Sequence, residues 1–255
     1  MLRIIKYIMY DILRTRFMFI YFLFLLLSTI ALFQLDSEAS KVVMSLMNVV
    51  LMVVPLISVV FTTIHFYNSY EFIELMLIQP VNRKVVFWSE YLAVTISLSL
   101  AFLLGVGIPI LLYGANASAL MLLYSGLMLT LVFVSMAFLA AVLTRDKAKA
   151  IGVGLLFWFY FVLIYDAFVL WVIYTFSDYP LEKVSLALIA FNPVDLARIL
   201  MLLQLDISAL MGYTGAFFKN FFEGYAGFIF STALLLVWMV LPVGFATRIF
   251  SKKDL

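Results

Sequence analysis

The chain is built from long, uninterrupted apolar stretches that are separated by short polar segments. Six of these stretches reach roughly 20 residues, which is the length that a helix needs to cross a bilayer. A membrane β-barrel would alternate apolar and polar residues, so the continuous stretches indicate helices. The pattern predicts an all-α integral membrane protein, a single transmembrane domain over residues 1–255, with spans near Phe17–Leu35, Val42–Phe66, Tyr91–Tyr113, Ala119–Thr144, Ile151–Phe176 and Tyr225–Thr247.

Composition excludes the soluble classes of protein. Apolar residues make up 67% of the chain and charged residues 12%, against about half and about a quarter in soluble domains. A globule of this size could not hide so much apolar surface, which excludes a cytosolic enzyme, a disordered protein and a nucleic-acid-binding domain. Cysteine is absent and His65 is the single histidine, so thiolate sites are excluded and a histidine metal site would need other chains.

Lys and Arg residues are distributed unevenly between the two sides of the six predicted spans. The positive-inside rule places the richer side in the cytoplasm, and an even number of spans puts both termini on that side. The first span is longer than the apolar core of a signal peptide, which favours an uncleaved anchor. We therefore expect a multi-pass membrane protein with both termini and 12 of its 16 basic residues in the cytoplasm: Arg3, Lys6, Arg14, Arg16, Arg83, Lys84, Arg145, Lys147, Lys149, Arg248, Lys252 and Lys253.

A short amphipathic helix is predicted over residues 70–80, in the cytoplasmic connection between the second and third spans. Phe72, Leu75, Met76 and Gln79 recur at helical spacing and form its apolar stripe. Glu71 and Glu74 lie on a more polar face, and Pro80 ends the helix. Such a helix is either a surface connector or a docking element for a soluble partner.

The connection before the last span is nearly fifty residues long and is expected to contain a helical hairpin over residues 192–222. Asn192 as the capping residue, Pro193 at the first position and Asp195 at the third are typical of a helix start. Asp195 and Arg198 are three residues apart and can pair. The hairpin would dip into the outer leaflet or cover the outer mouth of the bundle, unless it only shields the last span from water.

Asp166 is the one carboxylate that the sequence places well inside a predicted span. It lies about 22 Å along the helix from Ile151 at 1.5 Å per residue, in the outer half of the bilayer. Exposure of a charge to lipid costs roughly 3 kcal/mol or more, so Asp166 needs a partner or a function. An ion pair with the outer segment through Arg198 or Lys219 is one interpretation, and a role in the transport path or in transmitting motion is the other.

Known catalytic patterns are missing from the sequence. Neither the nucleotide-binding pattern Gly-x-x-x-x-Gly-Lys-Ser/Thr nor the Gly-x-Ser-x-Gly or His-Glu-x-x-His motif occurs, so no catalytic residue is expected. One off-centre Asp166 and no internal repeat argue against a secondary transporter. The 13 methionines are scattered, which favours core filling over copper binding.

The string Glu74–Arg83 resembles the coupling-helix signature of the permease subunits of ABC-2 type transporters, and the six spans with both termini inside resemble the same family. The resemblance implies a non-catalytic permease without a cofactor of its own, which works with an ABC ATPase that binds ATP and Mg²⁺. It also implies that ATPase contacts come from Glu71, Glu74, Leu75, Gln79, Pro80 and Arg83.

The strings 192–198 and 204–216 resemble the NosY-type branch of this family, whose members support maturation of the copper sites of nitrous oxide reductase. That resemblance implies a homodimer, a NosF-like ATPase and a periplasmic NosD-like protein on the outer face. The NosD-like protein would contact Asn192, Pro193, Asp195, Arg198, Gln204 and Asp206. A generic ABC-2 exporter of a lipid, drug or peptide stays an alternative, as does a secondary transporter or membrane scaffold. The transported species, whether a sulfur species, copper or none, stays open.

Overall fold

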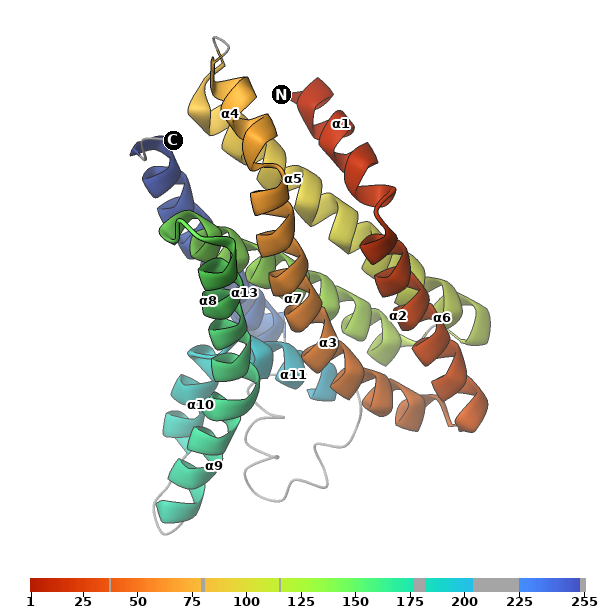
Figure 1. Cartoon of the computed structure of the whole chain (residues 1–255). Coiled ribbons are helices and arrows are strands. Elements are labelled where there is room, and N and C mark those ends of the chain that lie inside the picture. The colour runs from red at the N-terminus through yellow and green to blue at the C-terminus, as the bar shows by residue number, and fades with distance from the viewer. Residues whose placement is uncertain (37, 79–80, 115, 177–181, 204–224, 253–255) are drawn as a thin grey trace.

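The computed structural model describes residues 1–255 apart from 37, 79–80, 115, 177–181, 204–224 and 253–255. The described residues form helices joined by short turns, with no strand among them (Figure 1). In chain order the elements are α1 (Leu2–Leu13), α2 (Arg16–Leu35), α3 (Ala39–Asn68), α4 (Tyr70–Ile78), α5 (Arg83–Phe102), the π-helix η1 (Leu103–Gly107), α6 (Ile108–Tyr113), α7 (Ala117–Leu143), α8 (Lys147–Phe159), the π-helix η2 (Tyr160–Ile164), α9 (Tyr165–Thr175), α10 (Glu182–Ala190), α11 (Pro193–Leu203) and α13 (Tyr225–Lys252).

Six helical stretches of the described chain are long and apolar enough to cross a membrane, which confirms the predicted all-α membrane fold. They are α2, α3, α5 with η1 and α6, α7, α8 with η2 and α9, and α13. The main difference from the predicted bounds is the third stretch, which begins at Arg83 rather than Tyr91. Asn82 caps this helix by accepting a hydrogen bond from the Lys84 amide at 3.0 Å, and Phe87 in the added turns is buried.

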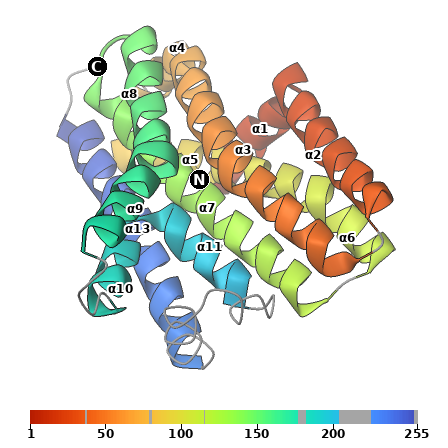
Figure 2. The same ribbon diagram turned by 90° about the horizontal axis from the view of Figure 1, so that it is seen from below.

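The helix α7 lies at the centre of the bundle (Figure 2) and is the most deeply buried of the six stretches. Ala137, Ala140 and Ala141 are fully buried, and their small side chains allow α3 and α13 to pack closely against α7. The stretch α8–η2–α9 is the least buried and carries large apolar side chains such as Leu156 and Trp171 on its surface. An exposed surface of this kind suits contact with lipid tails, which are as apolar as these side chains.

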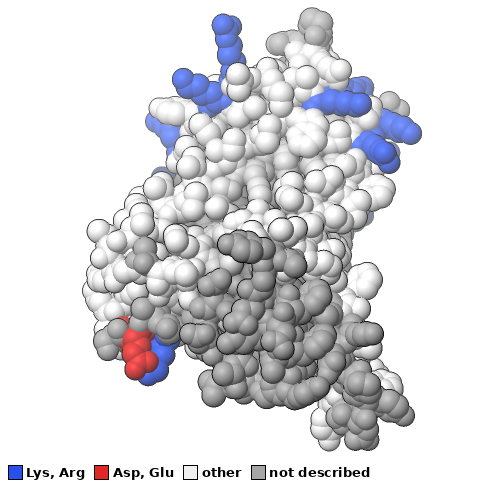
Figure 3. Space-filling view, turned by 180° about the vertical axis from the view of Figure 1, so that it is seen from behind, with Lys and Arg blue, Asp and Glu red and all other residues white. Residues whose placement is uncertain are grey.

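Both termini and α4 lie at one end of the bundle (Figure 1), and Lys and Arg side chains gather at that end on the face shown in Figure 3. We call this the basic end, and the opposite end, with α10 and α11, the far end. Aromatic rings join the spans at the basic end. Phe66 contacts Phe138 edge-on with 5.8 Å between ring centroids, and Phe87 contacts Phe250 at 5.4 Å, so α3, α5, α7 and α13 form one packed body there.

The first helix, α1, is amphipathic and packs on α5 with Ile8 and Ile12 buried. Its Tyr7 ring stacks on Phe72 of α4 with 5.9 Å between centroids. This contact places α1, the N-terminal helix, beside α4, the predicted coupling helix.

At the far end, α11 begins at Pro193 as the sequence predicts. The Asn192 side-chain oxygen accepts a hydrogen bond from the Val194 amide at 3.0 Å, which is the expected cap. The apolar face of α11 packs against α7 and α13 and comprises Val194, Leu196, Ala197, Leu200 and Met201, all buried. The second half of the predicted hairpin falls within 204–224, outside the described residues.

Candidate functional site

A row of four exposed side chains follows the outer face of α4, at the basic end. Glu71, Glu74, Leu75 and Ile78 are spaced three and four residues apart, so they share one side of the helix. Leu75 is 63% exposed and Ile78 82% exposed, so the two side chains add apolar area to this face. We call these four residues the α4 stripe. Two carboxylates beside two apolar side chains make it suited to docking against a protein surface.

The opposite face of α4 packs on the bundle, and it differs from the predicted apolar stripe. Ile73 is buried and Phe72 and Met76 are partly buried against the core, whereas Leu75 points outward. The sequence of α4 is apolar on nearly every side, so periodicity alone did not determine which side turns inward. Ser69 connects α4 directly to α3, and this connection orients the helix: the Ile73 amide donates to the Ser69 carbonyl at 2.9 Å.

The remaining predicted coupling residues lie beyond α4. Gln79 and Pro80 fall outside the described residues. Arg83 is the first residue of α5 and its side chain is half-buried. The prediction that these residues contact an ATPase stays a prediction.

Two hydrogen bonds connect the residues just before α4 to the turn between α7 and α8. The Tyr67 hydroxyl lies 3.0 Å from the Thr144 hydroxyl, and the Lys147 ammonium donates to the Asn68 side-chain oxygen at 2.7 Å. Both bonds join the last residues of α3 to the α7–α8 turn. These bonds connect the base of α4, through α3, to the ends of two further spans.

A buried acid–base pair that the sequence interpretation missed lies one turn below this base. Glu90 of α5 is 1% exposed, and its Oε2 lies 3.3 Å from Nε2 of His65 in the last turn of α3. Phe61 stacks on the His65 ring. The sequence-based third span began at Tyr91, which left Glu90 in the loop, so Asp166 is not the one carboxylate buried in the bundle. The cap at Asn82 was the available signal for the earlier helix start.

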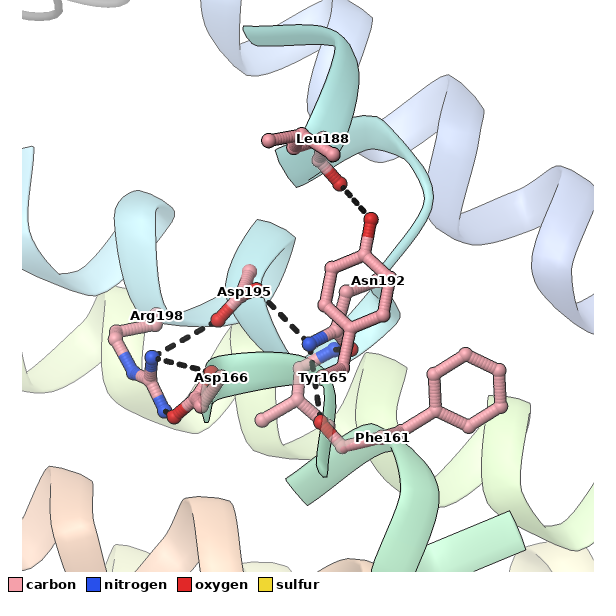
Figure 4. Close-up of polar contacts among 8 residues, drawn as sticks. Phe161, Tyr165, Asp166, Leu188, Asn192, Asp195 and Arg198 are labelled. Atoms are coloured by element: carbon pink, nitrogen blue, oxygen red, sulfur yellow. Dashed lines mark hydrogen bonds and ion pairs between the residues drawn. The ribbon is translucent and has the colours of Figure 1, made fainter. Parts of the chain in front are cut away.

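A second polar cluster occupies the far end (Figure 4). Asp166 of α9 and Arg198 of α11 form a two-bonded ion pair, with NH1 to Oδ1 at 3.1 Å and NH2 to Oδ2 at 2.7 Å. NH1 of Arg198 also donates to Asp195 at 2.8 Å. Parallel bonding of a guanidinium to a carboxylate is the strongest form of this pair. The structure thus confirms the ion pair between Asp166 and the segment before the last span, with Arg198 as the partner.

Asn192 joins the same cluster to the backbone of η2. Its side-chain nitrogen donates to the Phe161 carbonyl at 3.0 Å and to Oδ2 of Asp195 at 2.9 Å. One Asn side chain therefore caps α11, orients Asp195 and bonds to the fifth membrane-spanning stretch.

The cluster holds two carboxylates and one guanidinium. Burial raises the pKa of Asp195 to about 7, the Arg198 guanidinium opposes this rise, and the Asp166 carboxylate adds to it. Burial alone would lower the pKa of Arg198, but the hydrogen bonds that Arg198 donates to Asp166 and the negative charge of Asp195 raise it, so Arg198 stays charged. The protonation of Asp195 therefore sets the net charge of the cluster near neutral pH.

Of the residues predicted to contact a periplasmic partner, the four that the structure describes are buried or partly buried. Asn192, Pro193 and Asp195 are buried within this chain, and Arg198 is partly buried. Their polar groups are used by the contacts described above, which sequence spacing could not show. Gln204 and Asp206 lie outside the described residues, so contact with a partner stays a prediction.

Comparison with known families agrees with this architecture. The chain matches the family described as ABC-2 family transporter protein over residues 72–255, which is more than half of its length. The matched part begins within α4 and runs through the far-end cluster to the last span. None of the curated proteins matches the chain. With six apolar spans and this match, the chain belongs to the ABC-2 family of transporter proteins.

Proposed function

We propose that this chain is a non-catalytic permease subunit that couples ATP hydrolysis by a separate ABC ATPase to transport or conformational work across the membrane. Membership in the ABC-2 family supports the permease role. The α4 stripe is the observation that carries the coupling role: Glu71 and Glu74 offer charge, and Leu75 and Ile78 offer apolar area, on one exposed face. Bound ATP and Mg²⁺ belong to the ATPase subunit.

Motion of the ATPase would reach the membrane through the base of α4. Ile73 anchors α4 in the core, and Tyr67 and Lys147 connect its base to the α7–α8 turn. In this proposal, these contacts would carry movement of α4 to α3 and its neighbours.

The orientation and the assembly follow from this role. The basic end is cytoplasmic by the positive-inside rule, which puts the α4 stripe on the side where ATP is available. One chain presents one α4, and two ATPase subunits that close on each other need two such helices, so the functional unit is a homodimer in the bacterial inner membrane.

The finer assignment is the NosY-type branch. The strings 192–198 and 204–216 support it, and in that branch the permease pairs with a NosF-like ATPase and a periplasmic NosD-like protein in the maturation of the copper sites of nitrous oxide reductase. A generic ABC-2 exporter of a lipid, drug or peptide is the alternative within the family. A secondary transporter or scaffold would work without an ATPase.

Reversing charge on the α4 stripe tests the coupling role. Glu71→Lys with Glu74→Lys in the full chain should weaken binding of the ATPase subunit by roughly tenfold or more. The proposal places basic residues of the ATPase opposite these two glutamates, and the substitutions would put like charges across the interface. Affinity is measured by co-purification and titration in detergent or nanodiscs. Glu38→Lys, an exposed glutamate at the far end, is the matched control and should bind normally. Equal affinity of the double variant and the control would refute α4 docking.

A separate experiment tests the branch. Deletion of the gene in its own host should leave nitrous oxide reductase without its copper sites, and the intact gene should restore them. A fully metallated reductase in the deletion strain would refute the NosY-type assignment and would leave the permease role standing.

A further inference from the structure

Among the described residues, the helices of the far end form more polar contacts with one span than with any other. Three polar contacts join them to the fifth membrane-spanning stretch: Arg198 with Asp166, Asn192 with the Phe161 carbonyl, and the Tyr165 hydroxyl with the Leu188 carbonyl at 2.7 Å (Figure 4). These contacts are spread along α10 and α11, so they fix both the position and the rotation of the two helices.

The contacts with the other spans are of a different kind. Leu196, Leu200 and Met201 pack on α7 and α13, and apolar packing is not directional. The described polar bond to α13 is the one from the Trp238 ring nitrogen to the Ala190 carbonyl at 3.2 Å, at the joint between α10 and α11. Small sliding of packed helices is an established kind of protein motion, and sliding of α11 along α7 would leave the bidentate ion pair between Arg198 and Asp166 intact.

The π-helix η2 explains how the fifth stretch offers these partners. The Tyr165 amide bonds to the Tyr160 carbonyl, five residues back, and so does not bond to the Phe161 carbonyl, four residues back. The Phe161 carbonyl accepts the Asn192 side chain instead. The wider turn also shifts the residues that follow it around the helix, which includes Asp166. Single π-turns inside helices recur at functional sites for this reason.

We propose that Asp166, Asn192 and Arg198 form a latch that makes α10 and α11 move as one body with the fifth span while they slide against α7. This inference rests on the proposed permease function, because the ATPase supplies the motion. Arg198 and Asn192 are positioning residues in this mechanism: they act through α11 and touch no substrate. Movement of the fifth span is thereby carried to the far end of the bundle.

The first arm of the test measures the latch without an ATPase. Amide hydrogen exchange over residues 193–203 is followed in the full chain in lipid nanodiscs. Asp166→Asn and Arg198→Met should each speed exchange at least tenfold, and the double variant should be no faster than Arg198→Met alone, because both remove one interaction. Glu38→Gln removes an exposed ion pair with Lys41 at the same end and should leave exchange unchanged.

A charge exchange protects this arm against a variant that fails to fold. Asp166→Arg combined with Arg198→Asp keeps one pair of opposite charges and should recover most of the lost protection. Independent, additive effects of the two single changes, or no effect of either on α11, would overturn the latch.

The second arm measures motion in the assembled complex with its ATPase. The chain has no cysteine, so pairs of spin labels can be introduced cleanly, one pair at Trp171→Cys and Ile199→Cys and another at Leu120→Cys and Ile199→Cys. When a non-hydrolysable ATP analogue binds, the distance from α9 to α11 should stay constant and the distance from α7 to α11 should change. The opposite result, or two constant distances, would overturn the proposal. Failure of the ATPase to bind would instead refute the proposed function, and the exchange arm would still decide the latch.

Discussion

Asp195 shows how a single buried carboxylate can make one end of a membrane protein sensitive to pH. Two carboxylates share the Arg198 guanidinium, so the cluster carries one excess negative charge when both are ionised. Burial makes this excess costly, which is why the pKa of Asp195 lies near 7 instead of near 4. Protonated Asp195 leaves a balanced pair between Asp166 and Arg198, and the latch is then tightest.

The sign of the pH effect follows from the raised pKa. The pKa of Asp195 in the native state lies above its ordinary value of 3.8, so binding of the proton stabilises the native state. This stabilisation is complete below pH 3.8 and is lost as the pH rises through about 7. Opening of α11, followed by hydrogen exchange corrected for the intrinsic rate, should therefore increase roughly tenfold from pH 6 to pH 8. The Asp195→Asn variant should show no such increase. A wild-type chain with a flat profile over this range would contradict the prediction.

The pair of His65 and Glu90 gives a prediction at the basic end. Removal of Glu90 takes away the carboxylate that faces His65, although Ser69 still lies 3.3 Å from the same ring nitrogen, and this loss costs about 1–3 kcal/mol. Glu90→Leu should therefore lower the unfolding free energy by about that amount, measured by denaturant titration in detergent. Replacing both members, as His65→Phe with Glu90→Leu, should recover most of the loss, because Phe61 can stack on the new ring. Glu38→Leu breaks an exposed pair and should cost less than about 1 kcal/mol. If the double replacement is as unstable as Glu90→Leu alone, the two residues do not act as a pair.

At the scale of elements, α8 approaches α3 closely at one glycine of α8, Gly154. A Cβ atom at Gly154 would meet the Val59 side chain at 2.5 Å, whereas a Cβ at Gly152, two residues earlier in the same helix, would meet nothing within 4 Å. The two helices can therefore lie this close together only because Gly154 has no side chain.

These two glycines form a matched pair for experiment. Gly154→Ala should lower the unfolding free energy by about 1–3 kcal/mol, because the stiff Val59 side chain must move. Gly152→Ala should be neutral or raise it by about 0.5–1 kcal/mol, because alanine favours helix. Thermal unfolding of both variants in the same detergent makes the comparison. Equal melting temperatures would mean that α8 and α3 are free to separate.

The elements also show where sequence reasoning succeeds and where it ends. Long apolar runs predicted six spans, and the Asn192–Pro193 start of α11 was predicted because capping depends on neighbouring residues alone. The side of α4 that faces the core was predicted only in part: Phe72 and Met76 pack on the core as expected, but Leu75 is exposed. A helix with so many apolar residues satisfies several orientations. The π-turn at Tyr160–Ile164 and its bond to Asn192 were beyond prediction too, since they depend on residues about thirty positions apart.

At the scale of the whole molecule, the two ends are chemically different, and the central helix α7 contacts elements at both of them. The α4 stripe and the basic side chains lie at one end, and the latch lies at the other. The apolar stretches between them offer few charged groups among the described residues. Under the proposed function, coupling between the ends would run through rigid movement of the helices and not through a chain of charges.

This arrangement makes the orientation in the membrane decisive, and it is open to direct measurement. Because the chain has no cysteine, single substitutions at exposed positions report their own side of the membrane: Arg3→Cys and Lys252→Cys at the basic end, and Glu38→Cys at the far end. The positive-inside rule predicts that a membrane-impermeant maleimide labels Glu38→Cys in intact spheroplasts and labels the other two only after permeabilisation. The inverse pattern would put α4 outside the cell, where no ATP is available, and would remove the basis for ATPase docking at this helix.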